Sequence, residues 1–229
     1  MATDVRNIVV GAANVFFSAS PSSVTRPADV VANNTGSISL AQQLQENASW
    51  INAGLTTEGV EISYEPTYGE VMVDQLLDVA KIFKQSLKVT AKTTLSEATL
   101  ANLEVAFGND GTITTNSASS MVQMKLPAGA LGAEPVERSL VFVSQAAPGA
   151  TAAAWGAALG SASLSTVQSE RVYLARRVVS MDTVAHSLKR DAATVFPVTF
   201  RLLPDTNYSG QEYGKIIDRL YAATSPYQG

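Results

Sequence analysis

The chain offers one histidine, His186, for acid–base or nucleophilic chemistry. Asp182 lies four residues before it, a spacing that would place both side chains on one face of a helix. Serines are plentiful, so a Ser-His-Asp set can be written down, but the G-x-S-x-G motif that presents a nucleophilic serine is absent. We therefore interpret His186 as a surface or hydrogen-bonded residue, and we expect the protein not to be an enzyme.

Metal and cofactor chemistry has equally little support in the sequence. There is no cysteine, which excludes disulfides and thiolate-ligated metals, and one histidine cannot form a histidine cage. Asn109-Asp110-Gly111 resembles the opening of a calcium loop, but the required acidic alternation and the late glutamate are missing, so we interpret it as a turn. The phosphate-binding motifs G-x-x-x-x-G-K-S/T and G-x-G-x-x-G are both absent from the sequence, so nucleotide binding has no support. We expect no cofactor and no metal.

The charge composition of the chain indicates more about its function than its candidate catalytic residues do. Only 16% of the residues are charged, against about 25% in an average globular protein. The 16 basic and 20 acidic residues give a formal net charge of −4. A protein that grips nucleic acid through its phosphates is usually basic, so that function is disfavoured. Light charge in a chain with 46% hydrophobic residues indicates that much of the surface is covered by something else.

Four acids recur in a region with the period-2 alternation of a strand. They are Glu61, Glu65, Glu70 and Asp74. Apolar residues alternate with them on both sides of Pro66-Thr67-Tyr68-Gly69, so residues 59–74 are predicted to form a β-hairpin that turns there and has one acidic face. This face is either an ordinary solvated surface or a wall that must not adhere to polyanions.

Three lysines follow on the next predicted strand, residues 82–93. Lys84, Lys88 and Lys92 share one parity with Ser86 and Thr90, and the other parity carries the apolar residues Phe83, Leu87, Val89 and Ala91. The lysines either pair across strands with the acids or point toward a neighbouring subunit. A nucleic-acid groove is a weaker interpretation, because no aromatic residues are interleaved to stack on bases.

A helix is predicted after this strand, over about 95–107. Thr94-Leu95-Ser96-Glu97 fits a capping box, and Leu100, Leu103 and Phe107 fall on one helical stripe. Gly108 stands where a left-handed C-cap residue is expected.

The remaining elements are predicted to be mostly strands within one domain, 1–229. The N-terminal run Ile8–Phe17 is read as a buried strand, and a short helical turn is placed at Leu40–Glu46 within a long loop or arm at 18–50. Leu140–Val143 is apolar on both faces and predicts a central strand. Pro197 argues for an edge strand or a late start. Further strands are placed near 112–126, 137–145, 169–181 and 194–203, and 146–164 is an Ala/Gly-rich insertion. The fold class is mainly β and antiparallel. We expect neither a secretory signal nor a membrane span.

Residues 54–108 resemble bacteriophage tail tube proteins, the major tail proteins of long-tailed, non-contractile phages. The resemblance lies in an ordered set of features: the opening GLTTEGV, the acidic hairpin, a long strand ending in T-x-x-E, and the amphipathic helix TLSEATLANLEVAFG. The N-terminal VGAANVFFS and the late VFPVTFRLLPD and YGKIIDRLY also fit.

The resemblance implies a β-sandwich or partial barrel with one flanking helix. It implies a structural virion protein that forms homohexameric rings, which stack into the tail tube, with strands joining an inter-subunit β-barrel around a lumen for DNA ejection. Under it, Glu61, Glu65, Glu70 and Asp74 face the lumen, and 18–50 is a ring-to-ring arm. The implied partners are further copies of the chain, the tape measure, distal tail and terminator proteins at the tube ends, and double-stranded DNA that passes without specific binding. Assembly would take place in the host cytoplasm.

Two alternatives remain open at this point. The chain could form the inner tube of a contractile tail or a related injection machine, which shares the fold. It could instead be an all-β carbohydrate-binding or adhesin module, which would need exposed aromatic residues on one sheet face.

Overall fold

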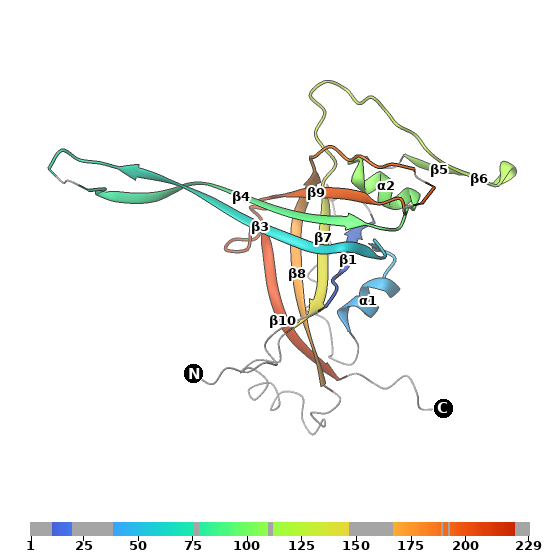
Figure 1. Cartoon of the computed structure of the whole chain (residues 1–229), viewed down its shortest axis with the longest axis horizontal. Coiled ribbons are helices and arrows are strands. Elements are labelled where there is room, and N and C mark those ends of the chain that lie inside the picture. The colour runs from blue at the N-terminus through green and yellow to red at the C-terminus, as the bar shows by residue number, and fades with distance from the viewer. Residues whose placement is uncertain are drawn as a thin grey trace.

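A computed structural model describes residues 11–19, 39–75, 78–109, 112–146, 167–188, 190–191 and 193–222. Within them the protein is mainly β, with an eight-stranded antiparallel sheet, a small two-stranded sheet and two short α-helices (Figure 1). The strands of the large sheet are β1 (Asn14–Ser18), β2 (Trp50–Asn52), β3 (Thr56–Val71), β4 (Lys81–Leu95), β7 (Arg138–Gln145), β8 (Val167–Ser180), β9 (Phe196–Leu203) and β10 (Gly214–Ala222). The small sheet pairs β5 (Ile113–Asn116) with β6 (Met121–Met124), and the helices are α1 (Leu40–Glu46) and α2 (Leu100–Ala106).

The large sheet branches at β8. One side of β8 pairs with β7, which continues to β1 and β2. The other side is divided, because residues 167–175 pair with β10 and residues 177–180 pair with β9. From β9 the sheet runs on through β4 to β3. In Figure 1, β7, β8 and β10 run steeply while β3, β4 and β9 cross them, so the chain folds back over itself. The sheet does not close into a barrel within the described residues.

This folding-over creates the larger of two apolar cores. Phe17 of β1, Leu140 of β7 and Phe200 of β9 are fully buried in it, and the rings of Phe17 and Phe200 lie 5.6 Å apart. Leu140–Val143 is buried on both faces between β1 and β8, as its unbroken apolar sequence predicts. The predicted strands at 137–145, 169–181 and 194–203 are confirmed as β7, β8 and β9.

The second core lies on the opposite face of β7 and β8, where α1 packs. Leu40 and Leu44 of α1 are completely buried against Val141, Val172 and Trp50. Ser39 is the N-cap of α1, and its hydroxyl accepts from the Gln42 amide in a capping box. The helical turn at Leu40–Glu46 is thus confirmed. It also corrects the predicted arm at 18–50, because α1 and the start of β2 occupy 40–50; residues 20–38 lie outside the described part of the chain.

The second helix is shorter than predicted, and the predicted cap at Thr94 is wrong. Thr94 and Leu95 are the last residues of β4, opposite Pro197 and Phe196. The real N-cap of α2 is Thr99, whose hydroxyl accepts from the Asn102 amide. The Glu97 side chain instead accepts a hydrogen bond from the backbone amide of Leu55, which lies far from it in the sequence.

The C-terminal end of α2 is as predicted. Gly108 follows the helix with φ +65°, the left-handed conformation that glycine adopts without strain. The buried face of the helix, however, is Asn102, Val105 and Ala106 rather than the predicted stripe.

The predicted hairpin turn at Pro66–Gly69 is also wrong. β3 runs without interruption from Thr56 to Val71, and the chain reverses only between Val71 and Lys81. Proline is tolerated in this position because β3 is an edge strand, with β4 as its one partner in the described part of the chain. Pro197 is the second residue of β9, ahead of the stretch that pairs with β8, which agrees with a late start.

Three further predictions are changed in detail. The strand at 112–126 is a hairpin, β5 and β6, joined by a short 3-10 turn at Ser117–Ser119. The strand at 8–17 overlaps β1 from Asn14, and residues 1–10 are not described. Of the Ala/Gly-rich insertion only Ala146 is described, and it is buried. Neither described helix is long and apolar enough to cross a membrane.

Candidate functional site

The most distinctive part of the protein is a two-stranded projection, residues 65–75 and 78–88, which we call the projecting hairpin. β4 pairs with β9 only from Val89 to Leu95, so its first eight residues have β3 as their one strand partner in the described chain. Figure 1 shows β3 and β4 extending together far beyond the body of the protein. An isolated two-stranded ribbon is marginally stable in water, so this hairpin is a candidate contact surface.

Four of the charged residues singled out in the sequence meet on one face of β3 and β4. Glu61 stands opposite Lys92, and Glu65 stands opposite Lys88. The Lys88 ammonium lies 3.8 Å from the Glu65 carboxylate, and both side chains are about half exposed. Cross-strand pairing, one of the two interpretations of the lysines, is therefore present in the structure.

The other two acids do not join this face. Glu70 has the opposite parity along β3 from Glu61 and Glu65 and stands opposite Ile82. Asp74 lies in the reversal beyond the end of β3. The prediction of a single acidic face assumed a turn at Pro66–Gly69, which would have brought Glu70 and Asp74 to the same face as Glu61 and Glu65. Because β3 continues through these residues, Glu70 stays on the opposite face from Glu61 and Glu65.

Lys84 also leaves the face predicted for it. The register shifts between Thr67 and Tyr68, whose partners are Ser86 and Lys84, so Gln85 is an extra residue on β4. This bulge changes the parity of β4 and moves Lys84 to the face opposite Lys88. There its ammonium donates to the Tyr64 hydroxyl at 2.8 Å and lies 5.2 Å from the ring centroid. The hydrogen bond with Tyr64 raises the pKa of Lys84, with support from the nearby Tyr68 and Tyr213.

The end of the projecting hairpin exposes apolar residues on both faces, among several charged ones. We call residues 69–75 and 78–83 the hairpin tip. Met72 is 70% exposed, Ile82 60% and Phe83 46%, and Val71 and Val73 are also exposed. Contiguous exposed apolar residues mark interaction sites in soluble proteins. Sequence periodicity missed this, because alternation shows which side of a strand a residue occupies but not whether that side is covered.

An apolar cleft lies at the root of the projecting hairpin. This root cleft has a volume of about 420 Å³. Its lining comes from β3, β4, β7, β8 and β9, together with Tyr213 and the start of β10. The lining residues are Ile62, Tyr64, Val89, Ala91, Phe142, Tyr173, Leu174, Ala175, Leu202, Tyr213, Gly214, Lys215 and Ile216. None of them is acidic, and Ile62 and Ile216 are exposed to solvent there.

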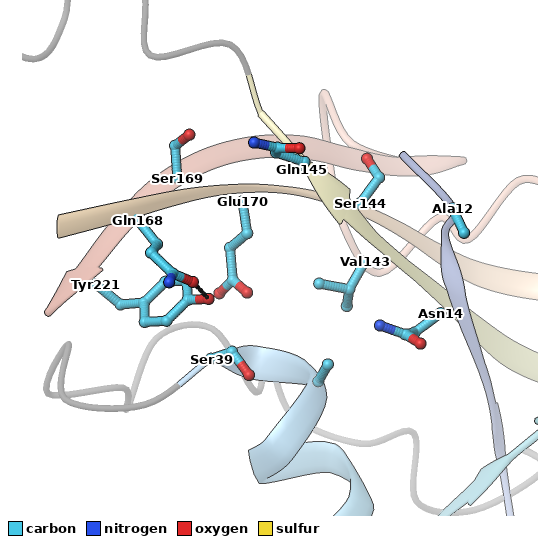
Figure 2. A pocket seen from close by; sticks show the side chains of 11 residues that line it. Ala12, Asn14, Ser39, Val143, Ser144, Gln145, Gln168, Ser169, Glu170 and Tyr221 are labelled. Carbon is cyan, nitrogen blue, oxygen red and sulfur yellow. Dashed lines mark hydrogen bonds between the residues drawn. The ribbon is translucent and has the colours of Figure 1, made fainter. Parts of the chain in front are cut away.

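A second, polar pocket of about 630 Å³ lies where α1 meets β8 and β10. Figure 2 shows the side chains of Gln168, Glu170 and Tyr221 gathered near Ser39 at the start of α1. Glu170 is buried, and its carboxylate accepts from the Leu40 amide and lies 2.6 Å from the Arg219 guanidinium. Burial raises the pKa of the Glu170 carboxyl, opposed by the Leu40 hydrogen bond and the charge of Arg219.

These contacts indicate what Glu170 does in the pocket. Because its oxygens already hold the first amide of α1 and the guanidinium of β10, the residue fastens three elements together. We therefore interpret the pocket as a structural junction between α1, β8 and β10.

His186 lies in an irregular segment and not on a helix. Its ring is 5.0 Å from that of Phe196 and 6.3 Å from that of Phe107, and the residue is exposed. Asp182 is exposed in the same segment. Over the described residues no group of three or more His, Cys, Asp or Glu side chains could hold a metal ion. Asp110 and Gly111 of the predicted turn lie outside the described residues.

No protein-family model matches this chain, and a comparison with curated proteins gives no match.

Proposed function

We propose that this chain is the structural subunit of a bacteriophage tail tube. In this proposal it polymerises as stacked hexameric rings that form a conduit for DNA ejection. The observation that carries it is the projecting hairpin, an apolar-tipped ribbon that has no core of its own. The sequence resemblance over residues 54–108 adds the family.

The free edge of the sheet supports assembly into a closed structure. β3 ends the sheet order, so one side of a 16-residue strand has no strand partner among the described residues. Long unprotected edges invite aggregation, and closing strands from several subunits into one barrel removes them. The branched, open sheet of one subunit is then a section of the proposed inter-subunit barrel, completed by its neighbours.

The polar face of β3 and β4 supports a conduit for DNA. Glu61 and Glu65 stand opposite Lys92 and Lys88, so this strip carries no net charge. Duplex DNA bears about one negative charge per 1.7 Å, and a surface without excess positive charge lets it slide. We propose that this strip faces the lumen and that Glu70 and Asp74, at the outer end of the hairpin, contact other subunits.

The proposal is tested by the size and shape of the purified protein. Light scattering after size-exclusion chromatography should give ring-sized oligomers, and negative-stain electron microscopy should show stacked rings with a central channel. A protein that remains monomeric over a wide concentration range and is absent from virions contradicts the proposal.

One observation favours the carbohydrate-binding alternative. Tyr64 and Tyr68 are both about 60% exposed and lie on the same face of β3, which is the aromatic presentation that such a module needs. A glycan-binding screen separates the two functions. Saturable binding that is lost in Tyr68→Ala, by a protein that forms no rings, would establish the alternative.

A further inference from the structure

We infer that the root cleft of one subunit receives the hairpin tip of a second copy of this chain. The inference rests on the proposed function in one respect, which is that the partner is another copy. It adds which two surfaces meet.

The two surfaces are chemically complementary. The root cleft is lined by apolar side chains and includes Lys215, with Lys84 beside its Tyr64 wall and no acidic residue in the lining. The segment from Gly69 to Lys81 has the sequence GEVMVDQLLDVAK, in which three acids outweigh one lysine. An apolar and acidic tip thus fits an apolar cleft with lysines at its margin.

The hairpin cannot fill its own cleft. The cleft lies beside Tyr64 and Val89, where β4 leaves β9, whereas Ile82 lies seven residues further out along β4. At about 3.3 Å per residue the tip is more than about 20 Å from the root of the same hairpin. A paired ribbon does not fold back over that length without breaking its own ladder, so the tip can reach a cleft only on another copy.

This contact has a definite symmetry. The tip and the cleft are different surfaces, so the contact is heterologous and runs from head to tail. Such contacts close into a ring when the rotation per subunit divides a full turn, and otherwise they build a helix. A ring of tips seated in neighbouring clefts also covers the apolar tip residues that a single chain leaves exposed.

Cysteine cross-linking tests the contact directly, because the natural chain has no cysteine. One variant carries Val73→Cys in the tip, and a second, distinguishable by a size tag, carries Ile216→Cys in the cleft. Both positions are exposed, so the variants should fold as the natural protein does, and circular dichroism checks this. Met72→Cys, also at an exposed position, provides a second tip variant. Mixing the two variants under mild oxidation should give a disulfide-linked heterodimer as the main product. A chain with both changes should give a ladder of multimers.

A matched control is Leu131→Cys with Ile216→Cys, since Leu131 is fully exposed in the segment between β6 and β7. This pair should cross-link at least tenfold less. If it cross-links and the tip variants do not, the cleft holds that segment and the inference is overturned.

The remaining outcomes separate the inference from the proposed function. Rings in the microscope without any cross-link from either tip variant overturn the contact and leave the tube proposal standing. A natural chain that never assembles overturns both.

Discussion

The two halves of β4 are one strand in two environments. From Val89 to Leu95 it lies between β3 and β9, and its apolar residues Val89, Ala91 and Leu95 are buried. From Lys81 to Lys88 it pairs with β3 alone among the described strands, and Ile82 and Phe83 are exposed to solvent. Each half contains three apolar residues at positions of the strand ladder, so the presence of apolar residues does not separate them. The difference is the covering layer that β9 and the core provide for the inner half, which the outer half lacks among the described residues.

The largest expected effect contrasts an aromatic residue in each region. Phe200→Ala removes a buried ring that packs against Phe17, and it should lower the free energy of unfolding by about 3–5 kcal/mol. Phe83→Ala in the hairpin tip should lower it by less than about 1 kcal/mol. Denaturant unfolding at a concentration where the protein is monomeric measures both. Equal losses would show that the projecting hairpin shares the core's stability and would break the comparison.

Ion pairs should show the same contrast with a smaller effect. Glu170→Gln keeps an acceptor for the Leu40 amide but leaves the Arg219 charge buried without its carboxylate, at a cost of about 3 kcal/mol. The matched change in the hairpin, Glu65→Gln, disrupts a half-exposed pair and should cost less than about 0.5 kcal/mol. Thermal unfolding of the two variants compares them, and a Glu170→Gln protein as stable as the natural one would contradict the role of Glu170 as a fastener.

Two glycines, one in the body and one in the projecting hairpin, should differ in the same way when each is replaced by alanine. A Cβ at Gly214, which has φ +135°, would overlap the carbonyl oxygen of Leu174, so Gly214→Ala should cost about 2 kcal/mol. A Cβ at Gly69 would meet only the ring of Phe83, 2.6 Å away, and that ring can turn aside. Gly69→Ala should therefore cost less than about 1 kcal/mol. Urea unfolding midpoints give both values, and a larger loss at Gly69 would mean that the hairpin is as tightly constrained as the body.

The smallest effect concerns an exposed pair in the body. Arg171 donates twice to Asp218, at 2.6 and 2.7 Å, and these hydrogen bonds lower the pKa of Asp218 below its ordinary value of 3.8. A lowered folded-state pKa adds stability above the ordinary pKa, and this stability is lost as the pH falls through the folded-state pKa. Because Asp218 is nearly half exposed, Asp218→Asn should cost less than about 1 kcal/mol at pH 7, and this cost should shrink as the pH falls below 3.8. Unfolding curves of both proteins between pH 7 and pH 2 measure this, and a difference that does not shrink with falling pH would rule out the carboxylate as its source.

The parts of the fold that could be predicted from the sequence are those where one local rule suffices. The double-sided apolar run Leu140–Val143 specifies a central strand, and the alternation around Val89 specifies β4. β10 was missed because Arg219 occupies a buried position, where its pairing with Glu170 on β8 replaces the apolar residue that alternation requires.

The parts that could not be predicted depend on partners far along the chain. Pro66–Gly69 has the composition of a turn, yet it continues as strand because β4 pairs with it on one side. On its other side no described strand requires the backbone N–H that Pro66 lacks. Thr94 has the spacing of a helix cap, but it belongs to β4 instead, where it pairs with Pro197 of β9. The bulge at Gln85, which moves Lys84 to the other face, has no signal in the composition. The sequence therefore predicted the face of Lys88 and Lys92 but not that of Lys84.

The pairing of β4 with β9 also has a mechanical consequence. The seven residue pairs that anchor β4 to β9 run along the same direction as the projecting hairpin. A pull on the hairpin along its length therefore loads their hydrogen bonds together in shear, and not one after another as in unzipping. A filament built from such joints would stretch little before a subunit yields, and the force would enter the body through β9 and spread from there to β8.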